Sequence, residues 1–469
     1  MKETLEREIK LVPGAGFVMP ELGGQLLPTR TFVSTYHDTP DLALARHGVT
    51  FRHRVEDGAG LWQLKIPHGA ARIELELPGP PARPPEQMTS LLVAFLRGRP
   101  PVPVARLRTR REGVRAAGAE IVDDAVAVLD GTRVTRRFRE LEVELLEGDE
   151  RTLRRLEKEL RRAGAEPRAL RPKLLEALDF SGALEPIEAP EGASPAEELA
   201  AALAEQVRRL LLHDPGTRLG RDPEDLHQLR VATRRLRAFL RAGRPLLDEG
   251  WAESLRAELG WLGSALGPAR DGDVLLERME EDVAELGEDR SAAESFLAEL
   301  AAERTWARAA AVEALSGDRY LALLDRLDAV GEPPLSGVSM SLAEIWRREL
   351  RRTRKAFDRL GAESHDDELH AARIRVKRAR YAAELAAPEL GRKGARFVDA
   401  AKQLQDVLGE HQDAVVAEER LRAWAEAQPA GRLAAGRLVE RARARMELAR
   451  ATWPGAWRRM RRAGRKAKR

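Results

Sequence analysis

The chain of 469 residues contains no cysteine. Disulfides, thiolate metal sites and cysteine nucleophiles are therefore excluded. Aromatic residues make up only 4%, which argues against a surface that recognises single-stranded nucleic acid by stacking on bases. No run of about 18 uncharged apolar residues occurs, and the charged N-terminus lacks the apolar core of a signal peptide. We therefore expect a cytoplasmic protein with no membrane span.

Lysine is scarce: it supplies 11 of the 80 basic residues, and arginine supplies the others. In such a background a lysine suggests that a compact point charge is required rather than a planar guanidinium. The 80 basic residues face 76 acidic ones, which leaves a net charge of +4. This balance argues against a protein that simply coats nucleic acid. It says nothing about how the charges are sorted locally.

The composition and periodicity of the sequence change along the chain. Residues 1–180 contain segments that alternate charged and apolar residues, which is typical of strands. Residues 181–196 are rich in proline and glutamate and lack apolar periodicity, so they are predicted to be a linker. From 197 onward alanine, leucine, arginine and glutamate dominate, which indicates helices. We therefore expect a β-rich domain followed by an all-α domain.

The helical half contains an internal repeat. The pattern H-x-x-R-x-x-x-[RK]-R-x-R begins at His227 and again at His370, 143 residues later. A second pattern, L-G-x-x-x-D, begins at Leu266 and at Leu408. Such self-similarity is typical of a duplicated structural unit. We predict repeats at about 197–330 and 341–460, followed by a basic tail at 461–469.

Rows of like charge occupy alternate positions of the predicted strands. Glu6, Glu8 and Lys10 share one face of a strand, and an E-x-E-x-E row spans 140–144. Carboxylates in a row repel one another unless cations neutralise them, and Mg²⁺ or Mn²⁺ are natural partners of oxygen ligands. A single such row is more often a solvated face. Several rows with apolar opposite faces favour a closed sheet with a charged lumen.

These motifs resemble the CYTH domain of the triphosphate tunnel metalloenzymes. The first is E-x-E-x-K at Glu6, Glu8 and Lys10, and the others match at Tyr36–Thr39, Thr50–Arg54, Trp62–Lys65, Arg108–Arg111, Glu140–Glu144 and Pro172-Lys173. The chain departs from the family pattern at His37, Gly113 and Pro172. The resemblance spans about 1–180.

The resemblance to CYTH domains implies an α+β fold with an eight-stranded antiparallel β tunnel. It implies that phosphates are bound by Lys10, Arg52, Arg54, Lys65, Arg111 and Lys173. It implies that Mg²⁺ or Mn²⁺ is held by Glu6, Glu8, Glu142 and Glu144, with Asp130 or Glu140. Lys10, Glu6 and Glu8 would be the catalytic core. The implied reaction is hydrolysis of a terminal phosphoanhydride of inorganic triphosphate or a related triphosphate.

The repeated pattern of the second half places its basic residues on one side of each helix at 100° per residue. It resembles the CHAD domain, the conserved histidine α-helical domain, over about 197–460. That resemblance implies two duplicated four-helix bundles that bind inorganic polyphosphate, with affinity that depends on pH through the two histidines. The implied contacts are Arg208, Arg209, His227, Arg230, Arg234, Arg235, Arg351, Arg352, His370, Arg373, Lys377 and Arg378.

The leading hypothesis is therefore a metal-dependent triphosphatase with a polyphosphate-binding domain, located in the cytoplasm and at polyphosphate granules. One alternative is a polyphosphate-binding protein without activity whose tunnel is degenerate. A second is nucleotide cyclisation, for which no adenine-recognition feature is visible. A third is nucleic-acid binding by the helical half, for which we expect at most nonspecific attraction to the basic tail. The oligomeric state is open.

Overall fold

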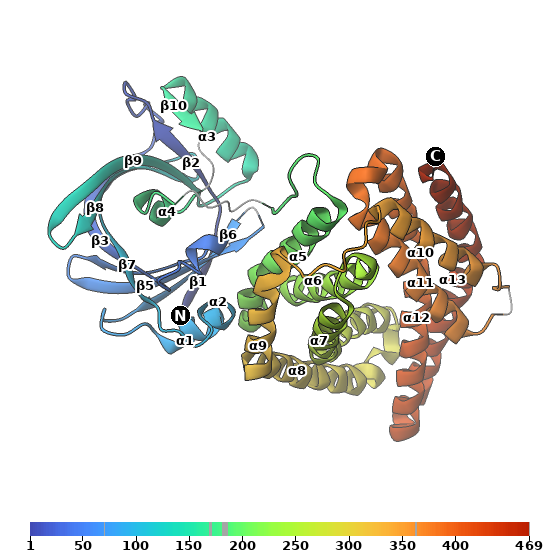
Figure 1. Cartoon of the computed structure of the whole chain (residues 1–469). Coiled ribbons are helices and arrows are strands. Elements are labelled where there is room, and N and C mark those ends of the chain that lie inside the picture. The colour runs from blue at the N-terminus through green and yellow to red at the C-terminus, as the bar shows by residue number, and fades with distance from the viewer. Residues whose placement is uncertain (70, 168–170, 181–185, 362–363, 469) are drawn as a thin grey trace. The chain divides into compact units, whose positions relative to one another are not determined.

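The computed structural model describes residues 1–69, 71–167, 171–180, 186–361 and 364–468 (Figure 1). The chain divides into two compact units, Met1–Pro186 and Ile187–Arg469, and each is described by itself. Within the predicted linker, residues 181–185 lie outside the described residues, as does residue 469.

The first unit is built on one antiparallel sheet of ten strands, in the order β1-β6-β5-β4-β3-β7-β8-β9-β2-β10. Three helices of at most 5 residues and the longer α3 accompany it. The strands are β1 (Lys2–Glu6), β2 (Glu8–Pro13), β3 (Gln25–Asp38), β4 (Thr50–Glu56), β5 (Ala59–His68), β6 (Ala71–Pro78), β7 (Val102–Ala116), β8 (Ala119–Asp130), β9 (Arg133–Leu145) and β10 (Ala165–Pro167). The helices are α1 (Glu86–Thr89), α2 (Val93–Leu96), α3 (Glu150–Arg162) and α4 (Lys173–Ala177).

The sheet closes on itself through its first two strands, which are separated only by Arg7. β1 pairs with β6, where Glu6 lies opposite Arg72, and β2 pairs with β9, where Glu8 lies opposite Glu144. One continuous segment thus joins the two sides of the sheet, which curves around a lumen (Figure 1). The predicted count of eight strands is wrong. The break at Arg7 divides the first strand into two, and β10 adds a short strand beside β2.

The alternation of these strands sorts polar from apolar side chains. On β9, Leu141 and Val143 are fully buried on the outer face of the sheet. They pack against Leu153, Leu156 and Leu160, which recur at helical spacing along α3. Burying this stripe is the main reason why α3 docks on the sheet. The charged residues that alternate with Leu141 and Val143 are left to face the lumen.

The second unit is all-helical. Its helices are α5 (Pro195–Leu219), α6 (Pro223–Ala242), α7 (Glu249–Ala284), α8 (Glu294–Ser316), α9 (Asp318–Leu327), α10 (Leu342–Phe357), α11 (Asp366–Leu385), α12 (Ala387–Ala427) and α13 (Arg432–Ala467). The repeated histidine motifs lie on α6 and α11, and the repeated L-G motifs lie on α7 and α12. The helix order therefore follows the sequence repeat.

One apolar core joins the two repeats. Leu276 and Met279 of α7 and Phe296 of α8 lie in the same buried cluster as Leu421 of α12 and Leu438 of α13. That the repeats form two four-helix bundles stays a prediction.

The predicted basic tail at 461–469 is helical as far as Ala467, where α13 ends. Among the helices of the described ranges, none is long and apolar enough to cross a membrane.

Candidate functional sites

The lumen of the sheet holds a cavity of about 240 Å³. Its lining includes every residue that the sequence analysis assigned to phosphate binding, together with four of the six assigned to metal. These are Glu6, Glu8, Lys10, Arg52, Arg54, Lys65, Arg111, Glu142, Glu144 and Lys173. These residues come from the polar faces of β1, β2, β4, β5, β7 and β9 and from the first residue of α4, and so they converge on the lumen.

Two lysines share one group of carboxylates. Lys10 Nζ lies 2.9 Å from Glu140 Oε1 and 2.5 Å from Glu142 Oε1. Lys173 Nζ lies 3.0 Å from Glu140 Oε1 and 2.5 Å from Glu142 Oε1. Burial alone would lower the pKa of Lys10, but the carboxylates of Glu142, Glu8 and Glu140 outweigh burial and raise it. Both lysines therefore stay protonated at neutral pH.

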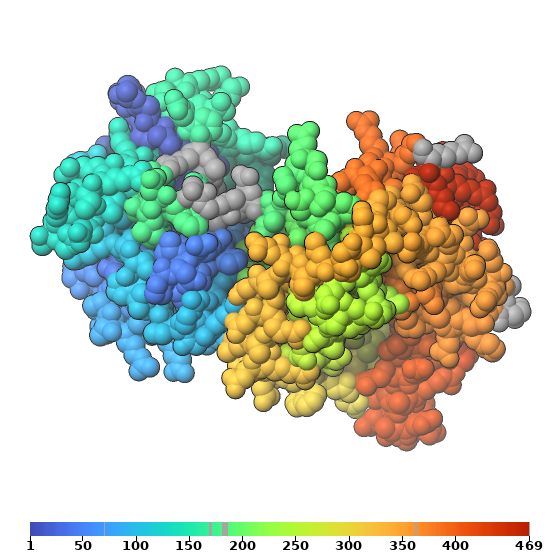
Figure 2. All heavy atoms as spheres, viewed as in Figure 1, coloured from blue at the N-terminus to red at the C-terminus, as the bar shows by residue number. Residues whose placement is uncertain are grey.

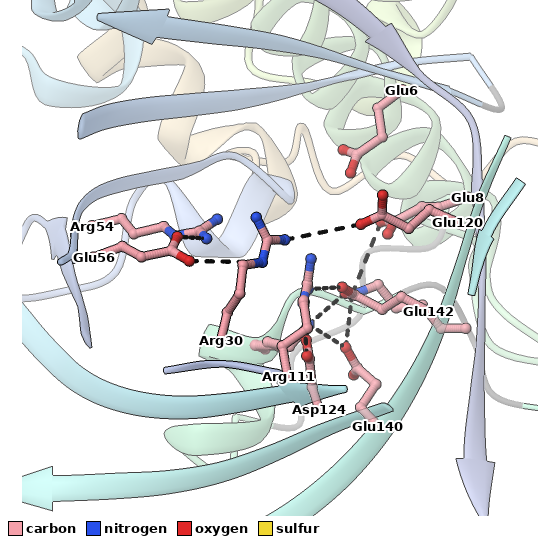
Figure 3. A network of polar contacts seen from close by, with 12 residues as sticks. Glu6, Glu8, Arg30, Arg54, Glu56, Arg111, Glu120, Asp124, Glu140 and Glu142 are labelled. Atoms are coloured by element: carbon pink, nitrogen blue, oxygen red, sulfur yellow. Dashed lines mark hydrogen bonds and ion pairs between the residues drawn. The ribbon is translucent and has the colours of Figure 1, made fainter. Parts of the chain in front are cut away.

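A residue that the sequence analysis missed orients Arg111. Asp124 on β8 is completely buried and accepts hydrogen bonds of 2.8 and 2.7 Å from the Arg111 guanidinium. The same guanidinium reaches Glu142 at 2.8 Å (Figure 3). Asp130, which we had assigned to metal, is exposed at the end of β8 and does not line the cavity. It lies six residues beyond Asp124, roughly 20 Å along the strand.

Another part of the cavity groups the carboxylates of Glu6, Glu8, Glu74 and Glu144 near Lys65. Glu6 and Glu8 point into the same space as Arg30 and Arg111 (Figure 3). Lys65 donates to both oxygens of Glu6, at 2.6 and 2.7 Å. Glu144 has no ion pair within 4 Å to any residue in the described part of the chain.

The pKa of Glu144 is raised to about 7, first by burial and then by the neighbouring carboxylates of Glu6, Glu74 and Glu8. Within the described residues no three acidic or histidine side chains already converge on one point suited to a metal ion. The donors nevertheless fit a hard divalent cation, because they are carboxylate oxygens whose charge is only partly offset. Glu6, Glu8 and Glu144 could hold such an ion once their side chains turn toward a common point.

Polar neighbours hold Arg52 in place. Its Nε donates to Gln63 Oε1 at 2.9 Å, and its Nη1 donates to the Tyr36 hydroxyl at 3.1 Å. Gln63 in turn donates to Glu74 at 3.1 Å and to Glu76 at 2.8 Å. Cross-strand register explains the network, because Arg52 lies opposite both Tyr36 and Gln63. Arg52 is therefore fixed before any substrate binds.

Arg30 is a further cation at the cavity that the sequence analysis did not assign. It lies next to a bulge in β3 and reaches Glu56 at 3.6 Å and Glu120 at 3.9 Å (Figure 3). Arg54 also pairs with Glu56. The motif search did not find Arg30 because the register shift between Leu27 and Arg30 interrupts the alternation of β3.

The three departures from the family pattern leave the cavity intact. The His37 ring is buried beside Trp62, 4.9 Å away between ring centroids, and does not line the cavity. At Gly113 a Cβ would lie 2.3 Å from the carbonyl oxygen of Ile121, so the strand contact requires glycine. Pro172 precedes α4, and Lys173 still reaches Asp124 at 3.0 Å.

A second candidate site lies on the helical unit, where α6 and α11 are neighbours. Arg234 of α6 lies near Arg373 and Lys377 of α11, and the three cations influence one another electrostatically. The pKa of Lys377 is lowered to about 7, first by burial and then by the charges of Arg373, Arg234 and Arg380. The two repeats thus bring their basic motifs into one cluster, whose charge Asp413 offsets in part.

In each repeat, the first arginine of the histidine motif lies against the glycine of the L-G motif. Arg230 donates to the Gly267 carbonyl at 2.8 Å and to Asp271 at 2.9 Å. In the second repeat, a Cβ on Gly409 would lie 3.2 Å from a nitrogen of the Arg373 guanidinium. The motif glycine therefore leaves space for the guanidinium, most tightly at Gly409.

The two motif histidines differ in their surroundings. The Nδ1 atom of His370 lies 2.8 Å from Gln412 Oε1. The pKa of His227 is lowered, first by burial and then by Arg270. Arg270 and Gln412 occupy equivalent positions of the two L-G motifs. The duplication has therefore placed a cation beside one histidine and an amide beside the other.

The other predicted polyphosphate contacts are dispersed. Several already have acidic partners: Arg208 and Arg209 with Glu205, Arg235 with Glu384, and Arg352 with Glu349. The charges that act on Arg378 are those of Arg241, Arg375, Glu349 and Arg256, and Arg234 is not among them. Arg351 lies on α10, near Lys468.

Comparison with known proteins follows the two units. A model of the CYTH domain matches residues 4–170, and a model of the CHAD domain matches residues 201–422. The uncharacterized protein Rv2226 of Mycobacterium tuberculosis (strain ATCC 25618 / H37Rv) is 32% identical over 436 residues, 84% of this chain and 82% of that protein. This chain is a CYTH–CHAD protein.

More distant similarities of the CYTH–CHAD protein are partial. Thiamine-triphosphatase of Homo sapiens is 42% identical over 71 residues, 15% of this chain and 29% of that protein. The structure of PptA from Streptomyces chartreusis, at 26% identity and a TM-score of 0.47, covers 57% of this chain and 100% of that one. The CHAD domain of Ricinus communis, at 24% identity and a TM-score of 0.49, covers 59% of this chain and 95% of that one.

Proposed function

We propose that the CYTH unit hydrolyses a terminal phosphoanhydride of inorganic triphosphate or a related triphosphate, with Mg²⁺ or Mn²⁺. The observation that carries this proposal is the meeting of two sets of charges in one cavity. Lysines and arginines line it together with the carboxylates of Glu6, Glu8 and Glu144, and Lys65 pairs with Glu6. A triphosphate needs the first group to bind its oxygens, and its metal ion needs the second. The match to thiamine-triphosphatase supports the same class of reaction.

The cations bind and orient the substrate. Arg52 is held by Tyr36 and Gln63, and Arg111 is held by Asp124, so both guanidinium groups are positioned in advance. Such preorganisation favours the charge that develops on phosphoryl oxygens during transfer. Lys10 and Lys173 would exchange their contacts with Glu142 for phosphate oxygens.

The carboxylates complete the site. A divalent ion bound there would supply charge neutralisation at the phosphoryl oxygens and would lower the pKa of a water molecule. Glu6, Glu8 and Glu144 would hold the ion. Glu142 would connect the metal ligands to the cations with which it pairs. Glu140 is fully buried between Lys10 and Lys173, so its role is to position the lysines rather than to hold metal.

The test is phosphate release by purified protein from triphosphate, long polyphosphate, ATP and thiamine triphosphate, each with Mg²⁺, with Mn²⁺ or with EDTA. We expect turnover of triphosphate that needs metal and falls at least 100-fold in Glu8→Gln. Arg111→Ala is compared with Arg110→Ala, because Arg110 occupies the opposite face of β7 and is 61% exposed. Equal activity of wild type and Glu8→Gln would refute the assignment.

The same panel distinguishes the alternative of a binding protein with a degenerate tunnel. That protein would be stabilised by triphosphate and metal in thermal melting but would release no phosphate. Formation of cyclic AMP from ATP would favour nucleotide cyclisation instead.

We further propose that the CHAD unit binds inorganic polyphosphate at the cluster of Arg234, Arg373 and Lys377. The cluster carries charge that helix packing brings together, and a polyanion would relieve this repulsion. Filter binding of labelled polyphosphate tests this, with Arg234→Ala and Lys377→Ala compared with Arg326→Ala on the exposed face of α9. A loss restricted to the first two variants is the expected result.

A further inference from the structure

The end of α13 contributes to a second basic surface that lies outside the proposed polyphosphate cluster. Two adjoining pockets of about 540 and 350 Å³ share Lys393 in their linings. Their cationic lining residues are Arg347, Arg392, Lys393, Arg396, Arg459, Arg462, Lys466 and Lys468. We call these eight residues, with Arg351 and Arg354 of α10, the α10–α13 surface.

Negative charge on this surface is almost absent. Among the residues that the structure describes, Glu389 is the only acidic one that lines either pocket. Its carboxylate is used locally, because it accepts hydrogen bonds of 2.7 and 3.2 Å from the backbone of Leu342 and Ala343 at the start of α10. Within the described residues, no cation of the α10–α13 surface has a carboxylate within 4 Å. Burial and the charges of Arg354, Arg351 and Arg347 lower the pKa of Lys468, as expected in such a field.

The cations form two rows on helices that touch. Arg347, Arg351 and Arg354 recur at helical spacing along α10, and Arg459, Arg462 and Lys466 do so along α13. The helices meet where Leu350 lies 3.0 Å from the position that a Cβ on Gly464 would take. Each row is about 10 Å long. The end of α13 lies at the molecular surface (Figure 2).

We propose that the α10–α13 surface binds the phosphate backbone of double-stranded nucleic acid without reading its sequence. Two rows favour a duplex, because it presents two phosphate strands on either side of a groove about 12 Å wide. A duplex also carries about one phosphate per 1.7 Å of axis, counting both strands. A length of about 10 Å of duplex therefore carries about six phosphates, as many as there are cations in the two rows. A single polyphosphate chain would need one row. The scarcity of aromatic residues leaves backbone contact as the available mode.

This surface is distinct from the proposed polyphosphate cluster. The match to the CHAD domain, residues 201–422, includes α10 and the part of α12 that carries Lys393, whereas α13 (Arg432–Ala467) lies beyond it. The first repeat offers no equivalent row, since positions 204 and 211, which correspond to Arg347 and Arg354, are alanine and leucine. The inference therefore does not rest on the proposed functions of the two domains.

The test uses the full-length protein in EDTA and a fluorescein-labelled 24-base-pair DNA duplex of arbitrary sequence, with anisotropy measured at several salt concentrations from 50 to 200 mM. Arg459→Gln, Arg462→Gln and Lys466→Gln are combined in one variant. The control combines Arg151→Gln, Arg154→Gln and Arg155→Gln, which removes the same charge from exposed positions of α3. Glutamine retains helix propensity, and circular dichroism checks the fold of both.

We expect the α13 variant to bind the duplex at least tenfold more weakly than wild type at 100 mM salt. The slope of log binding constant against log salt concentration should become less steep by about 2.7, because three phosphate contacts are lost. The α3 control should bind like wild type. Equal weakening in both variants, or no duplex binding at 50 mM salt, would overturn the proposal. A third result would also overturn the proposal: polyphosphate displaces the duplex at equal phosphate concentration, and polyphosphate itself binds the α13 variant more weakly.

Discussion

Asp124 holds the guanidinium of Arg111 through two hydrogen bonds of 2.8 and 2.7 Å, from a position with no solvent exposure. The two residues lie directly opposite each other on β8 and β7. The same carboxylate lies 3.0 Å from Lys173 Nζ. One buried aspartate thus positions two of the cations that face the cavity.

Asp124→Asn should raise KM for triphosphate at least tenfold and affect kcat less. The reason is that Arg111 and Lys173 would lose their common anchor, and breaking a buried ion pair costs roughly 3–5 kcal/mol. Asp123→Asn is the matched control, because the neighbouring aspartate pairs with Arg139 on an exposed face. Steady-state kinetics and thermal melting of both variants test this. Unchanged KM in Asp124→Asn would show that Arg111 needs no anchor.

Glu144→Gln should make the protein less responsive to Mn²⁺. Glu144 lies among like charges, and its electrostatic contact with Lys65 lies beyond ion-pair distance. A metal ion should therefore stabilise the wild type, and its loss to EDTA should lower Tm. In the variant the Tm difference between Mn²⁺ and EDTA should shrink by half or more. Glu147→Gln, on an exposed position of the same segment, serves as the comparison. An identical Mn²⁺ response in Glu144→Gln would exclude Glu144 as a ligand.

Polyphosphate affinity should increase as the pH falls from 8 to 6. Since the pKa of Lys377 is lowered to about 7, its amine is mostly neutral at pH 8 and mostly charged at pH 6. Our sequence-based expectation placed this dependence on the histidines, but the pKa of His227 is lowered by burial and Arg270. Lys377→Arg should flatten the titration of affinity, whereas Lys355→Arg on exposed α10 should not. A wild-type affinity that is constant across this range would contradict the prediction.

Removing the buried charge should also stabilise the fold. Between pH 7 and 10.5 the unfolded chain binds a proton at Lys377 that the folded chain does not, so stability from this residue rises with pH over that range. Lys377→Met should therefore raise the free energy of unfolding at pH 7 by roughly 0.5–2 kcal/mol, while weakening polyphosphate binding. Chemical denaturation gives the first quantity and filter binding the second. A destabilised variant would show that the amine is well accommodated.

Gly409→Ala and Gly267→Ala should differ although the sequence repeat makes them equivalent. A Cβ at Gly409 would lie 3.2 Å from the Arg373 guanidinium, whereas a Cβ at Gly267 would lie 4.0 Å from that of Arg230. Gly409→Ala should displace Arg373 and weaken polyphosphate binding severalfold. Gly267→Ala should leave binding unchanged and stabilise its helix by about 1 kcal/mol. Polyphosphate binding and thermal melting of the two variants test this. Equal binding by both would show that Arg373 does not contribute to the site.

The sequence by itself determined which face of each strand is charged. Alternation has a period of two, so Glu6, Glu8 and Lys10 had to share a face whatever the tertiary structure. The same reasoning placed Arg230 and Arg234 on one side of a helix. Local periodicity, together with the family motifs, therefore sufficed for the two-part fold, and ten of the twelve residues assigned to the tunnel line the cavity.

Tertiary structure alone decided how far each row extends and which charges meet. Asp124 and Asp130 share the same alternation, and only strand register brings Asp124 opposite Arg111 while leaving Asp130 at the strand end. Likewise, the pKa of Lys377 is lowered first by burial, then by Arg373 of its own helix and by Arg234, which lies 143 residues before it along the chain. Contacts between distant segments depend on packing and register, and no local pattern in the chain encodes them.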